Sequence, residues 1–210
     1  MSRALYFHGF ASSPQSAKIL ALRPLLEPGV ELVTPDLNVP DFEHLDWGAM
    51  VAHGVDEGRR CRPAVVVGSS LGALVALEVV RRGVVAPLVL IAPALGIGAR
   101  WLMRLPPGDP VAVFNHARSA DALIHRSFFE QMNAIEADNA PPAVPVTIVM
   151  GHRDETVPFE FVSSRWNEWI AAGVQPRSRV IDIADGDHGL TAYADLIARE
   201  IASAVGTSAE

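Results

Sequence analysis

The sequence predicts an α/β fold in which helices cover both faces of a doubly wound, mainly parallel six-stranded sheet. Short apolar runs rich in β-branched residues alternate with longer helix-compatible segments along most of the chain. These runs are hydrophobic almost throughout, as expected for parallel strands that are buried on both faces. With 210 residues, half of them hydrophobic and 20% charged, the chain is expected to form a single domain, residues 1–210, with a sizeable core.

The first part of the chain is expected to contain three strand–helix units. Each strand is a short apolar run, and each helix shows helical spacing and stops at proline, glycine or a pair of arginines. The predicted strands are residues 4–10, 30–36 and 64–68, and the helices that follow them are residues 16–26, 42–60 and 71–82, respectively. The second part is expected to contribute the strands 84–92, 144–151 and 179–184, and the helices 159–172 and 190–205.

One long segment, residues 94–143, interrupts this alternation. It carries no strand signal, and its only predicted regular element is a helix around 119–137. Because a connection of this length inside a domain is usually functional, we expect a short helical lid inserted in the domain.

Composition and charge exclude several classes of protein. The net charge of −7 argues against nucleic acid as a partner. The single cysteine, Cys61, precedes the central strand at its amino end and can form no internal disulfide. We find no signal peptide and no apolar run of 18 residues, so the expected location is the cytoplasm, without a membrane span. Lys18 is the only lysine, so any mechanism based on a lysine base or Schiff base would depend on it.

A candidate nucleophile lies between the strand 64–68 and the helix 71–82. The residues Gly68-Ser69-Ser70-Leu71-Gly72 fit the pattern G-x-S-x-G, and a strand–sharp turn–helix setting is what a nucleophile elbow requires. Ser70 is therefore the predicted nucleophile. The Leu71 N–H, at a helix N-terminus, is a candidate oxyanion donor. The competing interpretation is a glycine-bordered turn in which Ser69 or Ser70 only caps the helix.

A serine nucleophile needs a base and an acid that orients the base. His188 is the predicted base, because it lies in a glycine-bordered polar loop after the last strand. Asp154, which follows the strand 144–151, is the preferred acid. The rival acids are closer to His188 in sequence: Asp182, Asp185 and Asp187. A metal cluster of His152, Asp154, Asp185, Asp187 and His188 is disfavoured because it contains no paired-histidine motif, so we expect no metal and no cofactor.

The chain order Ser70, Asp154, His188 resembles that of the α/β-hydrolases. Within that superfamily, G-H-x-D-x-x-V-P around Asp154 and G-x-x-H before His188 are usual settings of acid and base. The resemblance implies a reduced α/β-hydrolase fold, because the two strands that precede the His8-Gly9-Phe10 strand in the full fold are missing. It also implies that the Phe10 N–H, with Ala11 as the alternative, is the second oxyanion donor beside Leu71, and that His8 braces this loop.

The 94–143 segment supplies a hypothesis for substrate binding. Its apolar side chains are expected either to line an acyl pocket or to belong to the ordinary core: Trp101, Leu102, Met103, Phe128, Phe129 and Met132.

These signals together predict a serine hydrolase, an esterase or acyl-thioesterase, that forms an acyl-enzyme on Ser70. The expected partner is a small-molecule or acyl-carrier ester or thioester, and nothing in the sequence indicates an oligomeric state. Two alternatives stay open. The fold can serve a non-catalytic binding module, or an enzyme that hydrolyses carbon–carbon bonds or performs perhydrolysis.

Overall fold

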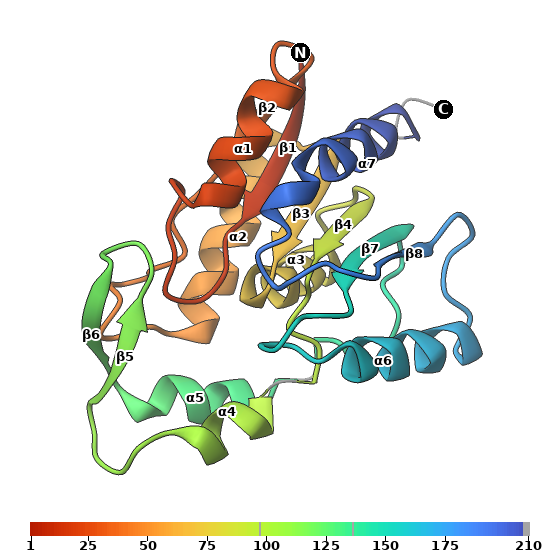
Figure 1. Cartoon of the computed structure of the whole chain (residues 1–210). Coiled ribbons are helices and arrows are strands. Elements are labelled where there is room, and N and C mark those ends of the chain that lie inside the picture. Colours follow the sequence, from red (N-terminus) through yellow and green to blue (C-terminus); the bar gives the residue numbers. More distant parts are fainter. Residues whose placement is uncertain (97, 136, 208–210) are drawn as a thin grey trace.

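A computed structural model describes residues 1–96, 98–135 and 137–207, and its centre is a six-stranded sheet (Figure 1). The strand order is β2-β1-β3-β4-β7-β8, and every neighbouring pair is parallel. The strands are β1 (Ser2–Phe7), β2 (Val30–Val33), β3 (Val65–Ser69), β4 (Leu88–Ile91), β7 (Val146–Gly151) and β8 (Arg179–Ile183). The predicted six-stranded parallel sheet is therefore confirmed.

Helices cover both faces of this sheet, as predicted. One face packs against α1 (Ala17–Leu26) and α7 (Ala194–Thr207), and α7 is preceded by the short 3-10 turn Thr191–Tyr193. The opposite face packs against α2 (Trp47–Cys61), α3 (Leu71–Arg81) and α6 (Phe159–Ala171). The helix α2 begins later than the predicted 42–60, because the Asp46 side chain accepts a hydrogen bond from the Ala49 N–H (2.7 Å) and caps it there.

The central strand β3 is buried along its whole length. Its side chains alternate between the two cores, so that Val65 and Val67 face α1 and α7 while Val66 faces α2 and α3. Because all strands are parallel, their carboxyl ends lie at one edge of the sheet. The loops that follow β1, β3, β7 and β8 meet there.

The 94–143 segment is only partly helical, which corrects two sequence expectations. It contains α4 (Gly98–Arg104) and α5 (Arg126–Asn133), but also an antiparallel hairpin of β5 (Val111–Asn115) and β6 (Ala120–Ile124). The hairpin was missed because β5 begins with four apolar residues in a row, which hides its alternation of inward and outward side chains. The predicted helix 119–137 therefore starts only at Arg126.

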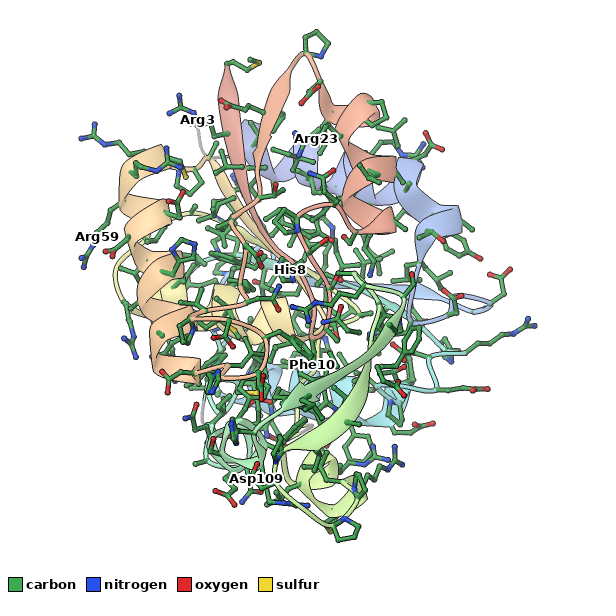
Figure 2. All side chains as sticks on the ribbon, turned by 90° about the vertical axis from the view of Figure 1, so that its left-hand side faces the viewer. Arg3, His8, Phe10, Arg23, Arg59 and Asp109 are labelled. Atoms are coloured by element: carbon green, nitrogen blue, oxygen red, sulfur yellow. The ribbon has the colours of Figure 1, made fainter. Side chains whose placement is uncertain are left out.

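This segment lies over the carboxyl end of the sheet and is tied to the loops below it (Figure 1). The His125 N–H donates to the Glu43 carbonyl (2.9 Å), and the Ala117 N–H donates to the Ala11 carbonyl (3.3 Å). Figure 2 shows Phe10 between the sheet and this segment, with Asp109 at the segment's far end. Residues 97 and 136 of the segment lie outside the described part of the chain.

Within the described ranges, no helix combines the length and the apolar character that crossing a lipid bilayer would require.

Candidate active site

Ser70 lies at the sharp turn between β3 and α3. Its backbone angles, φ 54° and ψ −120°, are in a region that L-residues rarely adopt, and such strain is characteristic of a nucleophile elbow. The neighbouring glycines permit this turn, because no side chain fits at either position. A Cβ on Gly68 would lie 2.4 Å from the Gly72 carbonyl oxygen, and one on Gly72 would lie 2.2 Å from the Phe7 carbonyl oxygen.

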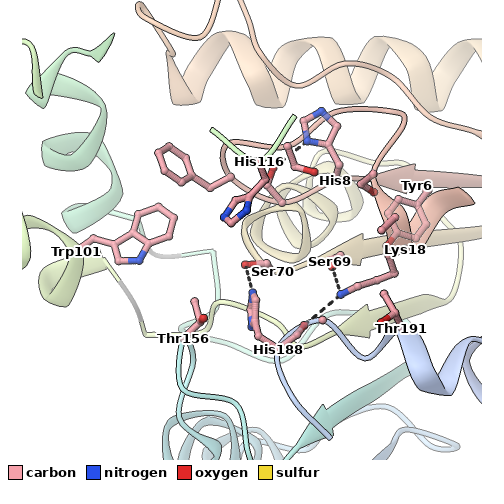
Figure 3. A pocket seen from close by; sticks show the side chains of 16 residues that line it. Tyr6, His8, Lys18, Ser69, Ser70, Trp101, His116, Thr156, His188 and Thr191 are labelled. Atoms are coloured by element: carbon pink, nitrogen blue, oxygen red, sulfur yellow. Dashed lines mark hydrogen bonds between the residues drawn. The ribbon is translucent and has the colours of Figure 1, made fainter. Parts of the chain in front are cut away.

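The loop after β8 brings His188 to this serine. His188 Nε2 lies 3.1 Å from Ser70 Oγ (Figure 3). The Ser70 side chain is nearly buried, whereas the imidazole keeps 28% of its surface exposed. This distance and this partial exposure suit a base that exchanges protons with a bound molecule.

The loop after β7 places Asp154 on the other side of the imidazole. Asp154 Oδ2 lies 2.7 Å from His188 Nδ1, and Asp154 Oδ1 accepts the N–H groups of Thr156 (2.9 Å) and Val157 (2.7 Å). The carboxylate is thus buried and fixed by backbone donors, so it can hold one tautomer and one orientation of the imidazole.

The loops that carry the acid and the base are joined by their backbones. A Cβ on Gly151, at the end of β7, would lie 2.1 Å from the Gly186 carbonyl oxygen in the loop after β8. The same carbonyl accepts the Arg153 N–H (2.9 Å). This close approach sets the distance between Asp154 and His188.

The three rival acids have other partners. Asp182 forms an ion pair with His152, and Asp185 accepts a hydrogen bond from the Tyr193 hydroxyl. Asp187 Oδ1 accepts the Leu190 N–H (2.8 Å). Of the four carboxylates weighed from the sequence, Asp154 is the one within hydrogen-bond distance of the His188 ring.

The two candidate oxyanion donors both belong to segments that approach Ser70 closely. Leu71 is the first residue of α3, where an N–H has no acceptor within the helix. Phe10 lines the cavity in front of Ser70, and a Cβ on the preceding Gly9 would lie 3.2 Å from Ser70 Cβ. His8 braces this loop: its Nδ1 lies 2.9 Å from the Gly9 carbonyl oxygen, and the Leu37 N–H donates to its Nε2 (3.0 Å).

A cavity of about 470 Å³ opens in front of these residues. Its walls come from β1 and the loop after it, the first turn of α1, the elbow and the loops after β7 and β8, together with Trp101 and His116 of the 94–143 segment. This volume is within the range of small-molecule sites.

Of the six residues weighed for an acyl pocket, Trp101 alone lines this cavity, and Met132 is buried in the core. Phe128 and Phe129 are buried below Phe10, and their ring centroids lie 5.8 Å and 5.7 Å from its centroid. Leu102 packs against the core, and Met103 is 78% exposed. The two phenylalanines therefore support the Phe10 loop from beneath, which is the core role weighed as the alternative.

Sequence reasoning missed the polar residues that line the cavity beside the elbow. Lys18 donates from Nζ to Ser69 Oγ (2.8 Å) and to the His188 carbonyl oxygen (3.4 Å). Burial lowers the pKa of Lys18 to about 8, although the carboxylates of Asp154 and Asp187 act in the opposite direction. One signal could have indicated this residue. Lys18 stands in the first turn of a helix, where the helix dipole disfavours a cation.

Neither the metal-cluster interpretation nor the cysteine gains support from the geometry. Among the described residues, no group of three or more His, Cys, Asp or Glu side chains could hold a metal ion. Cys61 is buried, and burial raises the pKa of its thiol, an effect that the nearby Arg60 only partly offsets.

Comparison with known proteins identifies the fold. The sequence model of a family described as "Uncharacterised protein family (UPF0227)" matches residues 3–202. No curated protein matches the chain significantly.

Among solved structures, the chain is similar to Est1E from Butyrivibrio proteoclasticus with bound ferulic acid, at a TM-score of 0.74 and 16% identity over 98% of this chain and 90% of that one. It is also similar to mouse alpha/beta hydrolase domain-containing protein 10, at a TM-score of 0.70 and 19% identity over 98% of this chain and 90% of that one. A third similar structure is the esterase domain of a Rhodothermus marinus protein, at a TM-score of 0.70 and 16% identity over 96% of this chain and 85% of that one. The predicted α/β-hydrolase fold is thereby confirmed.

Proposed function

The chain belongs to the uncharacterised protein family UPF0227, and from this fold and the geometry at Ser70 we propose that it is a serine hydrolase that cleaves carboxylic esters or thioesters. The observation that carries the proposal is one continuous array. Ser70 Oγ lies 3.1 Å from His188 Nε2, and His188 Nδ1 lies 2.7 Å from Asp154 Oδ2. The serine also faces a cavity. The esterases among the similar structures support the same class of reaction.

In the first half of the proposed reaction, His188 Nε2 accepts the proton of Ser70 Oγ while Oγ attacks the acyl carbonyl carbon. The carbonyl oxygen becomes a tetrahedral oxyanion, which the N–H groups of Leu71 and Phe10 stabilise. Asp154 keeps the proton on His188 Nδ1 and stabilises the imidazolium. His188 then gives its new proton to the leaving alcohol or thiol, and an acyl-enzyme on Ser70 remains.

In the second half, water replaces the leaving group. His188 takes a proton from this water, whose oxygen attacks the acyl carbon, and the second tetrahedral oxyanion occupies the same two N–H groups. When it collapses, Ser70 leaves as the alcohol after receiving the proton from His188, and the carboxylic acid is released. No step requires a cofactor.

The 94–143 segment is the proposed lid that selects the acyl group. Trp101 and Phe10 form an apolar wall of the cavity, with ring centroids 5.0 Å apart. We place the reaction in the cytoplasm, on a small-molecule or acyl-carrier substrate, and the single cysteine, which is free, fits a reducing compartment.

The test is a screen of p-nitrophenyl esters and acyl thioesters of graded length, with Ser70→Ala as the blank. We expect kcat/KM to fall by about 10⁴-fold or more in the variant, while its circular dichroism spectrum stays that of the wild type. Equal turnover by both proteins would refute the assignment of Ser70. Binding of acyl compounds without turnover by either protein would instead indicate a non-catalytic binding module.

A further inference from the structure

The cavity has two ends of different character, and Ser70 lies between them. Figure 3 shows Trp101 on one side of Ser70 and His188, and Tyr6, Lys18, Ser69 and Thr191 on the other side. We call the second side the polar end and define it by those four residues together with Ser16 and Ala17, all of which line the cavity. An acyl pocket alone gives no reason for these groups.

The first element of the polar end is the ammonium group of Lys18. A lysine has three N–H donors, and the contacts to Ser69 Oγ and to the His188 carbonyl oxygen engage two of them. Within the described residues, Lys18 forms no salt bridge with any carboxylate. Its third donor and its charge are therefore available to a molecule in the cavity.

The second element is the hydroxyl of Tyr6, a residue of β1 that is only 1% exposed. This hydroxyl is buried and has no hydrogen-bond partner in the described part of the chain, although Tyr6 lines the cavity. Burial raises the pKa of the phenol, an effect that the nearby Ser69 side chain offsets only in part, so the phenol stays a neutral O–H donor at physiological pH. A buried donor without a partner is unfavourable in the folded protein, and a bound acceptor would remove this cost.

The third element is the start of α1. Ser16 caps this ten-residue helix, and Ser16, Ala17 and Lys18 of its first turn line the cavity. The N–H groups of a first turn have no acceptor within the helix, and the helix dipole favours an anion there. No Asp or Glu lines the cavity within the described residues, whereas Lys18, His8, His116 and His188 do. Lys18 therefore supplies the one lysine or arginine charge among the described residues that line the cavity.

We propose that the polar end is a carboxylate-binding subsite, in which the Lys18 ammonium, the Tyr6 hydroxyl and the first turn of α1 hold an anionic group of the substrate. This inference rests on the proposed hydrolase function and narrows its substrate to an ester or thioester that carries a free carboxylate. A single lysine assisted by a hydroxyl matches one negative charge, whereas phosphate dianions usually recruit several cations or an arginine.

The experiment compares two matched pairs of esters at pH 7. Mono-p-nitrophenyl glutarate and p-nitrophenyl valerate differ by a carboxylate on the acyl side. The second pair, 4-acetoxybenzoate and p-tolyl acetate, differs by a carboxylate on the leaving-group side. The readout is the ratio of kcat/KM for the charged ester to that for the uncharged ester, because differences in intrinsic reactivity cancel when two variants are compared.

In one of the two pairs, we expect Lys18→Met to lower this ratio by about tenfold or more, as for the loss of a charged hydrogen bond, mainly through KM. Tyr6→Phe is expected to lower the ratio by about threefold to tenfold. The control Arg23→Met removes one positive charge from the same helix, but Arg23 lies outside the cavity, so its ratio should stay within about twofold of wild type.

Two results would overturn the inference while leaving the proposed function intact. One is an unchanged ratio in both pairs. The other is an equal loss on charged and uncharged esters, which would make Lys18 only a support of the His188 loop. If no ester were turned over above the Ser70→Ala background, the proposed function would fail instead.

Glutarate binding provides a readout that does not depend on turnover or on the folding of any variant. We expect wild-type protein to bind glutarate in calorimetry, and glutaramide to bind at least about tenfold more weakly because it lacks the charge. Equal affinity for the two compounds, or binding of neither, would overturn the subsite.

Discussion

The edge of the sheet and the 94–143 segment form opposite walls of one cavity, but they are built differently. At the edge, each proposed catalytic residue lies in the turn or loop that follows a parallel strand, and Ser70 and Asp154 are themselves nearly buried. Among its described residues, the segment above contributes Trp101 and His116 to the cavity and carries exposed apolar side chains, among them Met103 and Phe114. The difference suggests that the edge performs the chemistry and the segment selects the acyl group. Substitutions of the proposed catalytic residues at the edge should therefore slow all substrates alike, and substitutions in the segment should change the preference among acyl groups.

The strongest test of the edge is Asp154→Asn. It keeps the shape of the side chain but favours the wrong tautomer of His188, so we expect kcat to fall by about 10³- to 10⁴-fold for every ester tested. Steady-state kinetics on short and long esters measures this. The control Asp185→Asn changes an exposed carboxylate bound to Tyr193 and should stay within about threefold of wild type. A larger loss in the control than in Asp154→Asn would show that the acid is misassigned.

The elbow itself is tested by Gly72→Ala. The added Cβ would lie 2.2 Å from the Phe7 carbonyl oxygen, so β1 and α3 must move apart. We expect the free energy of unfolding in urea to fall by about 3 kcal/mol or more. Gly206→Ala, where a Cβ meets nothing within 4 Å, is the matched control and should leave the unfolding midpoint near that of wild type. Comparable stability of the two variants would contradict the tight elbow.

On the opposite wall, Trp101→Ala should change selectivity rather than chemistry. We expect KM for long-chain esters to rise by about tenfold, since a large apolar contact is lost, with a smaller effect on acetate esters. Met103→Ala removes an exposed side chain of the same helix and serves as the control. A uniform loss of kcat across all chain lengths in Trp101→Ala would place this residue with the chemistry and remove the contrast between the walls.

The smallest expected effect concerns pH and the polar end. Because the pKa of Lys18 is lowered to about 8, its cationic form predominates below that pH and is lost as the pH rises through it. The carboxylates of Asp154 and Asp187 raise this pKa, and the Tyr6 phenol stays neutral over the range. The ratio of kcat/KM for charged to uncharged esters should therefore be constant from about pH 6 to 7.5 and fall by up to about tenfold per unit above pH 8. A ratio independent of pH between 6 and 10 would contradict the role of the ammonium.

The sequence was most informative where one short motif fixes the local backbone. Gly68 to Gly72 follow a buried strand and open a helix, and this context was enough to place Ser70 at a sharp turn. His188 and Asp154 were located by their positions after successive strands, because parallel strands bring their carboxyl ends together.

The polar end could not be predicted, because no local pattern joins its members. Lys18 and Ser69 are 51 positions apart, and only the packing of α1 against the sheet brings them together. Tyr6 is an ordinary member of a buried strand until the fold shows that its hydroxyl lacks a partner. The β5–β6 hairpin was missed for a different reason: its first strand is apolar on both faces, so periodicity gave no signal.

Labelling with a fluorophosphonate tests the central claim most directly, since only an activated serine reacts with this probe. We predict one phosphonyl group per chain, located on Ser70 by mass spectrometry of the peptide that contains both Ser69 and Ser70. The label should be absent from Ser70→Ala and should form much more slowly in a folded His188→Ala variant. A folded wild-type protein that stays unlabelled, or one labelled at Ser69, would contradict a serine activated by His188 and Asp154.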